Sequence, residues 1–367
     1  MHLLHVVGAR PNFMKVAPVM RAFQRRPEAR QTLLHTGQHY DANMSDIFFE
    51  QLGIPRPDVA LGVGSGSHAV QTAQIMTQFE QAVLDRQPDW VLVYGDVNST
   101  VAAALVCAKL RIPVAHVEAG LRSFDRDMPE EINRIVTDQL ADLLLTPSAD
   151  GDENLRREGI PASRIRCVGN VMIDTLVEQL PKACRPDLPL DSRYALVTLH
   201  RPSNVDDPAA LQRVLSTLAE LSDRCQIVFP VHPRTRQRIQ SLDVTLPAKD
   251  RFLTTDPLGY LEWLALQRDA AVIITDSGGI QEESTYLGVP CLTLRENTER
   301  PITISEGTNL LVGGDMTKLH REAEKILRGQ GKRGLKPALW DGRAGERIAA
   351  LLSGELLPET FPLRTAA

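Results

Sequence analysis

Residues able to do chemistry gather directly after the apolar runs of this sequence. Each apolar run has the length of a buried β-strand. In open parallel sheets, ligands bind beyond the carboxyl ends of the strands. We therefore expect these clusters to line a binding site. The clusters of charged residues, histidines and glycines lie at residues 8–15, 95–100, 118–122, 199–202, 231–234 and 276–279.

The strongest local motif reads TDSGGIQEE and covers residues 275–283. An apolar strand ends there and a helix begins, so backbone N–H groups at the helix start can hold a phosphate. The alternative is a plain helix cap by Asp276 or Ser277, with Gly278 and Gly279 only turning the chain. Successive glycines permit close approach of a ligand, and other anion-binding groups recur at the same edge. These two observations favour a diphosphate site.

Three further residues could contact a bound nucleotide. Glu283, in the same helix, could accept hydrogen bonds from ribose hydroxyls or be an ordinary solvated glutamate. Arg10 and Lys15 flank the first strand-to-helix turn and could reach a phosphate, although a lone lysine more often faces solvent. Neither this turn nor the glycine-rich run at residues 62–66, which we interpret as a loop, matches the dinucleotide fingerprint G-x-G-x-x-G. We therefore expect no nicotinamide cofactor.

Three carboxylates are candidates for proton transfer. Asp96 and Glu118 each end an apolar run, and Glu130 follows Met128-Pro129, which is typical of a helix start. Acids near one site can shuttle protons. The alternatives are structural: an Asx-turn at Asp96, and an i,i+4 pair of Glu130 with Arg134, worth about 0.3 kcal/mol, unless Glu131 is the paired acid.

The histidines and cysteines do not predict a metal site. His200 and His232 precede an arginine or a proline in the second half, and single histidines are usually ordinary polar residues. The sequence contains no HExxH, and its five cysteines form no CxxC pair. We expect no bound metal, and scattered cysteines favour a reducing cytoplasm.

Alternating strand and helix patterns predict the elements that position these residues. Strands alternating with helices indicate βαβ units and mostly parallel sheets. The first series of expected strands is Leu3–Val7, Gln31–His35, Trp90–Tyr94, Val114–Val117, Leu143–Thr146 and Ile165–Val168, and the second is Tyr194–Thr198, Gln226–Pro230, Phe252–Thr254, Ala271–Thr275 and Pro290–Leu294.

The proline-rich stretch at residues 182–192 is the best candidate for a linker between the two series. We expect an N-terminal Rossmann-like domain with the acids at residues 1–180, and a C-terminal Rossmann-like domain at 181–345. A helix and tail follow at 346–367, and composition does not say on which domain they pack. The predicted fold class is α/β, with a cleft between the two domains.

Composition excludes several functional classes. The 367 residues are 43% hydrophobic and 24% charged with a net charge of -5, so no basic excess indicates nucleic acid and no acidic block indicates disorder. The longest apolar runs are much shorter than the ~20 residues of a membrane helix. The N-terminus lacks the pattern of a signal peptide. We expect neither a nucleic-acid nor a membrane partner.

Seven motifs, in order, closely resemble the non-hydrolysing UDP-N-acetylglucosamine 2-epimerase family. They are GARPNFMK, GDVNST, HVEAGLRSFDRDMPEEINR, LHRPSN, PVHPR, TDSGGIQEES and ENTERP, between residue 8 and residue 301. The resemblance implies the two-domain glycosyltransferase-B architecture, a UDP-sugar substrate, no cofactor and a homodimer. It implies catalytic roles for Asp96, Glu118, Glu130 and His200, and nucleotide binding by Arg10, Lys15, Leu258, Trp263, Ser277, Gly278, Gly279, Glu283 and Arg300.

The implied reaction interconverts UDP-N-acetylglucosamine and UDP-N-acetylmannosamine. The C2 proton of the sugar has no neighbouring carbonyl to make it acidic. The family's route is elimination of UDP across C1–C2, which gives 2-acetamidoglucal, followed by re-addition of UDP. Carboxylates would move the C2 proton, and cationic or N–H groups would stabilise the departing diphosphate.

The sequence departs from the family motifs at three places. GDVNST stands where GDTNST is usual, and LHRPSN lacks the acid that commonly follows the His-Arg pair. The segment Thr36–Asp41 differs from that of members activated by a second substrate molecule, which leaves room for a modified sugar such as a diacetamido uronate. A hydrolysing epimerase, a glycosyltransferase of the same fold and a non-catalytic nucleotide-sugar sensor remain alternatives. A sensor would be expected to have lost the acids.

Overall fold

The computed structural model describes residues 1–37, 52–242, 244 and 246–355. The chain divides into two compact units. The first holds the chain up to Thr175 together with the segment from Leu339 onward, and the second holds Leu176–Ala338.

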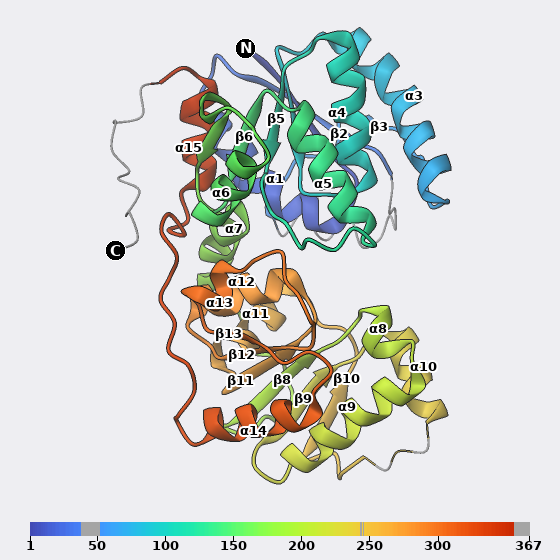
Figure 1. Cartoon of the computed structure of the whole chain (residues 1–367), viewed down its shortest axis with the longest axis vertical. Helices are drawn as coiled ribbons and strands as arrows, with labels where there is room; N and C mark the ends of the chain where they lie inside the picture. The colour runs from blue at the N-terminus through green and yellow to red at the C-terminus, as the bar shows by residue number, and fades with distance from the viewer. Residues whose placement is uncertain (38–51, 243, 245, 356–367) are drawn as a thin grey trace. The chain divides into compact units, whose positions relative to one another are not determined.

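The first unit, coloured from blue to green in Figure 1 with α15 in red, contains a parallel sheet in the order β3-β2-β1-β4-β5-β6-β7. Its strands are β1 (His2–Val7), β2 (Arg30–His35), β3 (Val59–Ala60), β4 (Trp90–Tyr94), β5 (Val114–Val117), β6 (Leu143–Thr146) and β7 (Ile165–Cys167). Its described helices are α1 (Arg10–Gln24), α3 (His68–Arg86), α4 (Asn98–Leu110), α5 (Pro129–Leu140), α6 (Ala149–Arg157) and α15 (Ala344–Leu352), and α7 (Val171–Gln179) crosses into the second unit.

The second unit contains a parallel sheet in the order β10-β9-β8-β11-β12-β13. Its strands are β8 (Tyr194–Thr198), β9 (Gln226–Pro230), β10 (Phe252–Thr255), β11 (Val272–Thr275), β12 (Cys291–Thr293) and β13 (Asn309–Leu311). Its helices are α8 (Pro202–Val205), α9 (Pro208–Leu221), α10 (Pro233–Ser241), α11 (Tyr260–Asp269), α12 (Gly278–Leu287), α13 (Ile302–Ser305) and α14 (Met316–Leu327).

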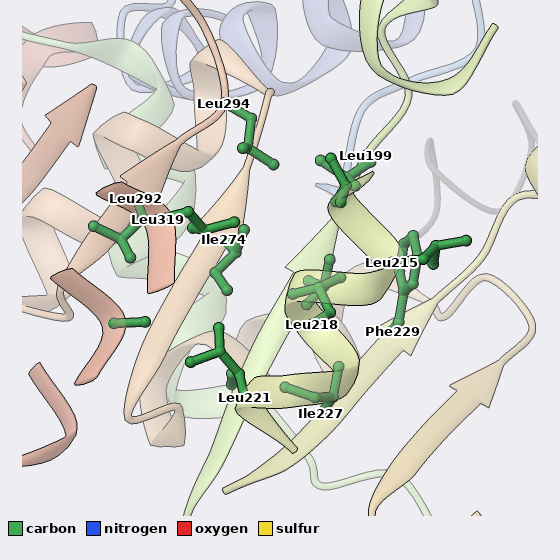
Figure 2. Close-up of a cluster of buried hydrophobic side chains, with 14 of the residues drawn as sticks. Leu199, Leu215, Leu218, Leu221, Ile227, Phe229, Ile274, Leu292, Leu294 and Leu319 are labelled. Carbon is green, nitrogen blue, oxygen red and sulfur yellow. The ribbon is translucent and has the colours of Figure 1, made fainter. Parts of the chain in front are cut away.

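Apolar strands and one face of each amphipathic helix form the core of each sheet. Figure 2 shows side chains of α9, such as Leu215 and Leu218, packed against Ile227 and Phe229 of β9 and Ile274 of β11. Strands covered on both faces are continuously apolar, which is why WVLVY and VIIT were predictable from sequence. The expected strands are present, with ends shifted by at most a residue. The sequence pattern missed β3 and β13, which have only two and three residues.

Strand order reverses direction at two places, between β1 and β4 and between β8 and β11. At such a switch point the loops after the two strands diverge, which opens room for a ligand. Gly8 and Gly95 follow the first pair of strands, and Leu199 and Asp276 follow the second. The motif clusters therefore lie where a parallel fold binds ligands.

The expected linker at residues 182–192 is wrong, because this stretch is part of the second unit. Arg185 forms an ion pair of 2.9 Å with Asp269, and the Asp191 N–H donates to Gln226 Oε1 at 2.9 Å. The boundary instead falls inside α7, between Thr175 and Leu176. An amphipathic helix gives no compositional break, so the sequence did not reveal it.

The C-terminal helix α15 packs on α1 of the first unit. Asp174 accepts hydrogen bonds from the N–H groups of Ala344 and Gly345 at 3.0 and 2.7 Å. Trp340 Nε1 donates to the carbonyl of Pro147 at 3.0 Å. Residues 339–345 therefore join the first unit, whereas the sequence placed them in the second.

Candidate functional site

Lys15 and Glu118 form a buried ion pair over Gly95 in the first unit. Lys15 points from α1 across the end of β4, and Glu118 directly follows β5. Gly95 has φ +63°, which favours glycine, and a Cβ there would lie 2.6 Å from Lys15 Nζ, so a larger residue would displace the pair. The expectation that Lys15 faces solvent is therefore wrong. Glu118 itself has φ +74°, a strained conformation for a non-glycine residue.

Asp96 and Glu131 share one arginine. Arg134 Nη2 lies 2.6 Å from Asp96 Oδ2, and Arg134 Nη1 lies 2.6 Å from Glu131 Oε2. Glu131 is buried and also accepts from the Ser123 hydroxyl and the Phe124 N–H at 2.9 and 3.0 Å. Glu131 thus holds the loop that leads into α5 in place. Of the two neighbouring glutamates, Glu131 and not Glu130 is the one paired with Arg134.

Glu130 differs from the other acids of this cluster. It is half-buried in the first turn of α5, and its carboxylate makes no hydrogen bond or ion pair with a side chain in the described ranges. The structure therefore places Asp96 and Glu118 after the adjacent strands β4 and β5, whereas Glu130 lies in the first turn of α5 without a partner of this kind. An acid without a structural partner is available to a substrate.

A buried charge network supports the loops after β4 and β5. His116 Nδ1 lies 2.6 Å from Asp138 Oδ1, and His116 Nε2 lies 2.8 Å from the carbonyl oxygen of Gly95. Arg122 Nη1 lies 2.7 Å from Asp138 Oδ2. Burial alone would raise the pKa of Asp138, but the contacts with His116 and Arg122 outweigh it and lower that pKa. The network fixes the backbone that presents Asp96 and Glu118.

A pocket of about 290 Å³ lies at the carboxyl ends of β8, β9 and β11 in the second unit. His200, Leu258, Trp263 and Ser277, each expected at the site from the sequence, all line it. Leu258 and Trp263 also pack on the apolar core of this unit, so the pocket has a rigid apolar wall. The other lining residues are Thr198, Leu199, Pro230, His232, Pro257 and Ile280.

The start of α12 fits an anion. Ser277 is the N-cap, and among the described residues its side chain makes no capping hydrogen bond. The plain-cap interpretation is therefore wrong, since Asp276 bonds to His200 instead. First-turn N–H groups of a helix attract negative charge. A Cβ on Gly278 would lie 2.5 Å from Arg300 Nη1, which places Arg300 beside this helix start.

Arg300 and Glu283 are both engaged within the protein. Arg300 Nε lies 2.9 Å from Glu282 Oε1, and its Nη1 pairs with Glu299. Glu283 is buried and accepts from the Tyr260 hydroxyl at 3.0 Å and from Gln267 Nε2 at 2.5 Å. Burial raises the pKa of Glu283, and these two donors offset part of the rise. A ribose hydroxyl would have to share Glu283 with Tyr260.

Two predicted features fall outside the described residues. The side chain of Arg10, at the start of α1, is one, and most of the segment 36–41 is the other. No group of three or more His, Cys, Asp or Glu side chains in the described ranges could hold a metal ion. None of the helices in those ranges is long and apolar enough to span a membrane.

Sequence comparison now identifies the family. The UDP-N-acetylglucosamine 2-epimerase family model matches residues 21–353. A UDP-N-acetylglucosamine 2-epimerase of Methanocaldococcus jannaschii is 42% identical over 366 residues, which cover 96% of this chain and 99% of that protein. The chain belongs to the UDP-N-acetylglucosamine 2-epimerase family. The resemblance predicted from the motifs is confirmed.

Solved structures agree with this family membership. A crystal structure of the Methanocaldococcus jannaschii enzyme in complex with UDP-GlcNAc and UDP matches with a TM-score of 0.86 over 96% of this chain and all of that one. The predicted α/β class with two Rossmann-like sheets, the glycosyltransferase-B type, is confirmed. A Pseudomonas aeruginosa UDP-2,3-diacetamido-2,3-dideoxy-D-glucuronate 2-epimerase is 41% identical over 357 residues, 96% of this chain and 99% of that protein.

Several residues of these two clusters escaped the sequence analysis. Arg134 was considered only as a partner of Glu130, and His232 was taken as an ordinary polar residue although it lines the pocket. Asp276 was considered only as a helix cap. A signal for Asp276 existed, because β8 and β11 are adjacent and in register at Thr198 and Thr275, so the residues after them are neighbours.

Proposed function

We propose that this chain interconverts UDP-N-acetylglucosamine and UDP-N-acetylmannosamine by elimination and re-addition of UDP through 2-acetamidoglucal. The observation that carries the proposal is the likeness, over nearly the whole length of both chains, to an epimerase crystallised with UDP-GlcNAc and UDP. The pocket in the second unit and the acid cluster in the first supply the two kinds of group that the reaction needs.

The nucleotide binds mainly to the second unit. Uracil enters the pocket beside Leu258 and Trp263, whose apolar surfaces suit a planar base. The diphosphate oxygens accept hydrogen bonds from the backbone N–H groups of Ser277, Gly278 and Gly279, where the helix dipole favours negative charge. Arg300, Arg10 and Lys15 add positive charge, and Glu283 accepts from ribose.

The acids of the first unit carry out the proton transfers. Breaking the C1–O bond sends its electrons to UDP, and a carboxylate takes the C2 proton as the C1–C2 double bond forms. In the return step C2 is protonated on the other face, and UDP adds back at C1. Asp96, Glu118 and Glu130 share these roles, and His200 stabilises the charge that develops on the leaving diphosphate.

A second candidate substrate is a diacetamido uronate form of the same UDP-sugar. The Pseudomonas aeruginosa relative carries that name at 41% identity. Elimination across C1–C2 is the same for both sugars, because they differ away from the reacting bond. The two candidates therefore share every catalytic role assigned above and differ only in contacts to the sugar substituents.

We propose that the protein acts as a homodimer in the cytoplasm. The dimer is the state that the family resemblance implies, and the five cysteines are all free thiols, as a reducing compartment requires. Light scattering on the purified chain tests the dimer, and a mass corresponding to one chain of 40.6 kDa would contradict it.

The reaction is tested by incubating the protein with each UDP-sugar in D2O and following it by NMR. We expect deuterium at C2 and a mixture of gluco and manno forms, with UDP retained on the sugar at equilibrium. Net release of free N-acetylmannosamine would indicate the hydrolysing alternative. Recovery of both substrates without deuterium would refute the proposal, and unchanged UDP affinity in Ser277→Ala and Arg10→Ala would refute the placement of the diphosphate.

A further inference from the structure

We propose that Asp276 is a positioning residue that fixes the orientation and tautomer of His200. This inference rests on the role of His200 in the proposed function. Asp276 touches neither the substrate nor the reacting atoms in this assignment, and it acts only through the histidine.

The carboxylate of Asp276 is fully buried and is surrounded by donors. Asp276 Oδ1 lies 2.8 Å from His200 Nδ1. The same carboxylate accepts from the backbone N–H groups of His200 and Arg201, at 3.1 and 2.9 Å from Oδ2. Asn204 Nδ2 donates to Oδ2 at 3.0 Å and also to the carbonyl of Leu294 at 3.1 Å. One buried anion therefore holds both the ring of His200 and the backbone that carries it.

The electrostatics of this arrangement agree with its geometry. Burial alone would raise the pKa of Asp276, but the donors from His200, Asn204 and Arg201 outweigh it and lower that pKa. Asp276 is therefore an anion at neutral pH. An anionic carboxylate can only accept hydrogen bonds, so the nitrogen that faces it must carry a proton.

The consequence for His200 follows from the two edges of its ring. Nδ1 is held against the buried carboxylate, while the side chain as a whole is 59% exposed and lines the pocket. Nε2, on the opposite edge, is left as the ring nitrogen that can meet a ligand. With Nδ1 protonated, the added proton of the cation must reside on Nε2, where it can be donated to an oxygen of the departing diphosphate. The aspartate of serine-protease triads orients its histidine by the same means.

Asparagine in place of Asp276 would conflict with this arrangement whichever way its amide is turned. With its nitrogen toward His200, the ring would have to present an unprotonated Nδ1, which moves the proton of the neutral ring to Nε2. In the opposite orientation the amide nitrogen takes the place of Oδ2. It would then face the Arg201 N–H and Asn204 Nδ2, which are both donors, so neither hydrogen bond could form. With little change in side-chain size, Asp276→Asn therefore either moves the proton of the His200 ring or breaks the contacts to Arg201 and Asn204 that hold the ring in place.

The decisive experiment is a double-mutant cycle between Asp276→Asn and His200→Asn, measured as turnover of the UDP-sugar in the D2O assay. We expect each single variant to lose about 100-fold or more in kcat, the usual range for a proton-transfer group. The double variant should be no slower than His200→Asn alone, because Asp276 has nothing left to position. Multiplied losses in the double variant would overturn the proposal.

Asp207→Asn is the matched control. Asp207 caps α9 in the same unit through a 3.0 Å hydrogen bond from the Ala209 N–H, and it does not line the pocket. Its kcat should equal that of the wild type. A loss in Asp207→Asn as large as in Asp276→Asn would mean that any aspartate lost from this unit has the same effect, and would overturn the positioning role.

A second measurement reads the state of the ring in the wild-type protein and uses His200→Asn only to assign the signal. In protein labelled with 15N-histidine, the neutral ring of His200 should show its proton on Nδ1, the signal being assigned by its absence in His200→Asn. A proton on Nε2 of the neutral wild-type ring would overturn the proposal. If the protein shows no epimerase activity on any UDP-sugar but has the Nδ1-protonated ring, the proposed function fails while the Asp276–His200 pair stands.

Discussion

The acids of the first unit differ in what they are bonded to. Glu118 pairs with Lys15, and Asp96 shares Arg134 with Glu131, so three of the four carboxylates face a cation. A carboxylate beside a cation is fixed in place and can stabilise positive charge that develops at C1. Glu130 has no such partner among the described residues, so its carboxylate can reach a proton of the substrate without breaking a contact within the protein.

Neighbouring Glu130 and Glu131 should therefore respond oppositely to the same substitution. Glu130→Gln should lower kcat by about 100- to 10,000-fold and leave the melting temperature unchanged, since a proton-transfer group is lost but no contact. Glu131→Gln should cost about 3–5 kcal/mol of stability, because it breaks a buried ion pair with Arg134. Turnover, UDP affinity and thermal melting of both variants decide this. A stable, fully active Glu130→Gln protein would remove Glu130 from the mechanism.

Glu118→Gln gives a third outcome. We expect a loss of turnover in the same range, with UDP affinity retained, together with some loss of stability because Lys15 is left buried without its partner. Wild-type turnover combined with reduced stability would leave Glu118 with only a structural role.

The buried Glu283 should make stability depend on pH. Its pKa is raised by burial above the ordinary value of 4.5, so the folded state binds this proton more tightly than the unfolded state. The contribution of Glu283 is therefore fully present below pH 4.5 and is lost as pH rises through the raised pKa. Glutamine does not titrate, so Glu283→Gln should not lose stability in this way. The melting temperature of the variant minus that of the wild type should therefore increase from pH 4 to pH 8. A difference that is independent of pH would contradict the burial of the charge.

At the scale of elements, the sequence predicted the strands well because their signals are local. Runs such as WVLVY are apolar throughout and are bounded by glycine or charged residues, so both ends are marked. Strand β13 lacks such a run, because Asn309 begins it and hydrogen-bonds with Thr293 inside the sheet. The division within α7 and the return of α15 were not predictable, since both depend on contacts between residues far apart in the chain.

The residue types at the site were predictable, but their pairing was not. Strand ends and glycines located Asp96, Glu118, His200 and Ser277 at two sheet edges. Lys15 reaches Glu118 across 103 positions of sequence, and no local pattern encodes that distance. Whether a charged side chain faces solvent or a buried partner is set by tertiary packing. The candidate site could thus be listed from the sequence, whereas its electrostatics required the structure.

Helix α4 begins with an unusual cap that can be tested. Val97, where related motifs have threonine, is the N-cap with φ -77° and ψ 167°, and its side chain makes no cap hydrogen bond. Threonine has nearly the same shape and adds a hydroxyl that can accept from a first-turn N–H. Val97→Thr should therefore stabilise the protein by about 1 kcal/mol, or roughly 2–4 °C in melting temperature. Val97→Ala, which adds no acceptor, is the control and should bring no gain.

At the scale of the whole molecule, the proposed nucleotide pocket and the acid cluster belong to different units. The pocket is formed wholly by residues of the second unit, between Thr198 and Ile280. The first unit is completed by the returning C-terminal segment, which Asp174 and Trp340 hold in place. Ligand and C-terminal contacts should therefore stabilise different parts of the chain.

This separation predicts two independently movable unfolding transitions in calorimetry. UDP at about 100 times its Kd stabilises what it binds by about 2.7 kcal/mol, or roughly 5–10 °C for a unit of this size, and should act mainly on the second unit. Gly345→Ala should lower the other transition, because its Cβ would lie 2.7 Å from the Pro18 carbonyl oxygen on α1.

Gly66→Ala is the matched control, since its nearest neighbour would be Val70 Cγ1 at an ordinary 3.8 Å, and it should move neither transition. The outcome depends on which unit each perturbation touches, so the two shifts must fall on different transitions. If UDP raised the same transition that Gly345→Ala lowers, the nucleotide would be binding mainly to the unit of the acids. The pocket beside Leu258 and Trp263 would then have to be abandoned as the nucleotide site, while the family membership and the acid cluster would stand.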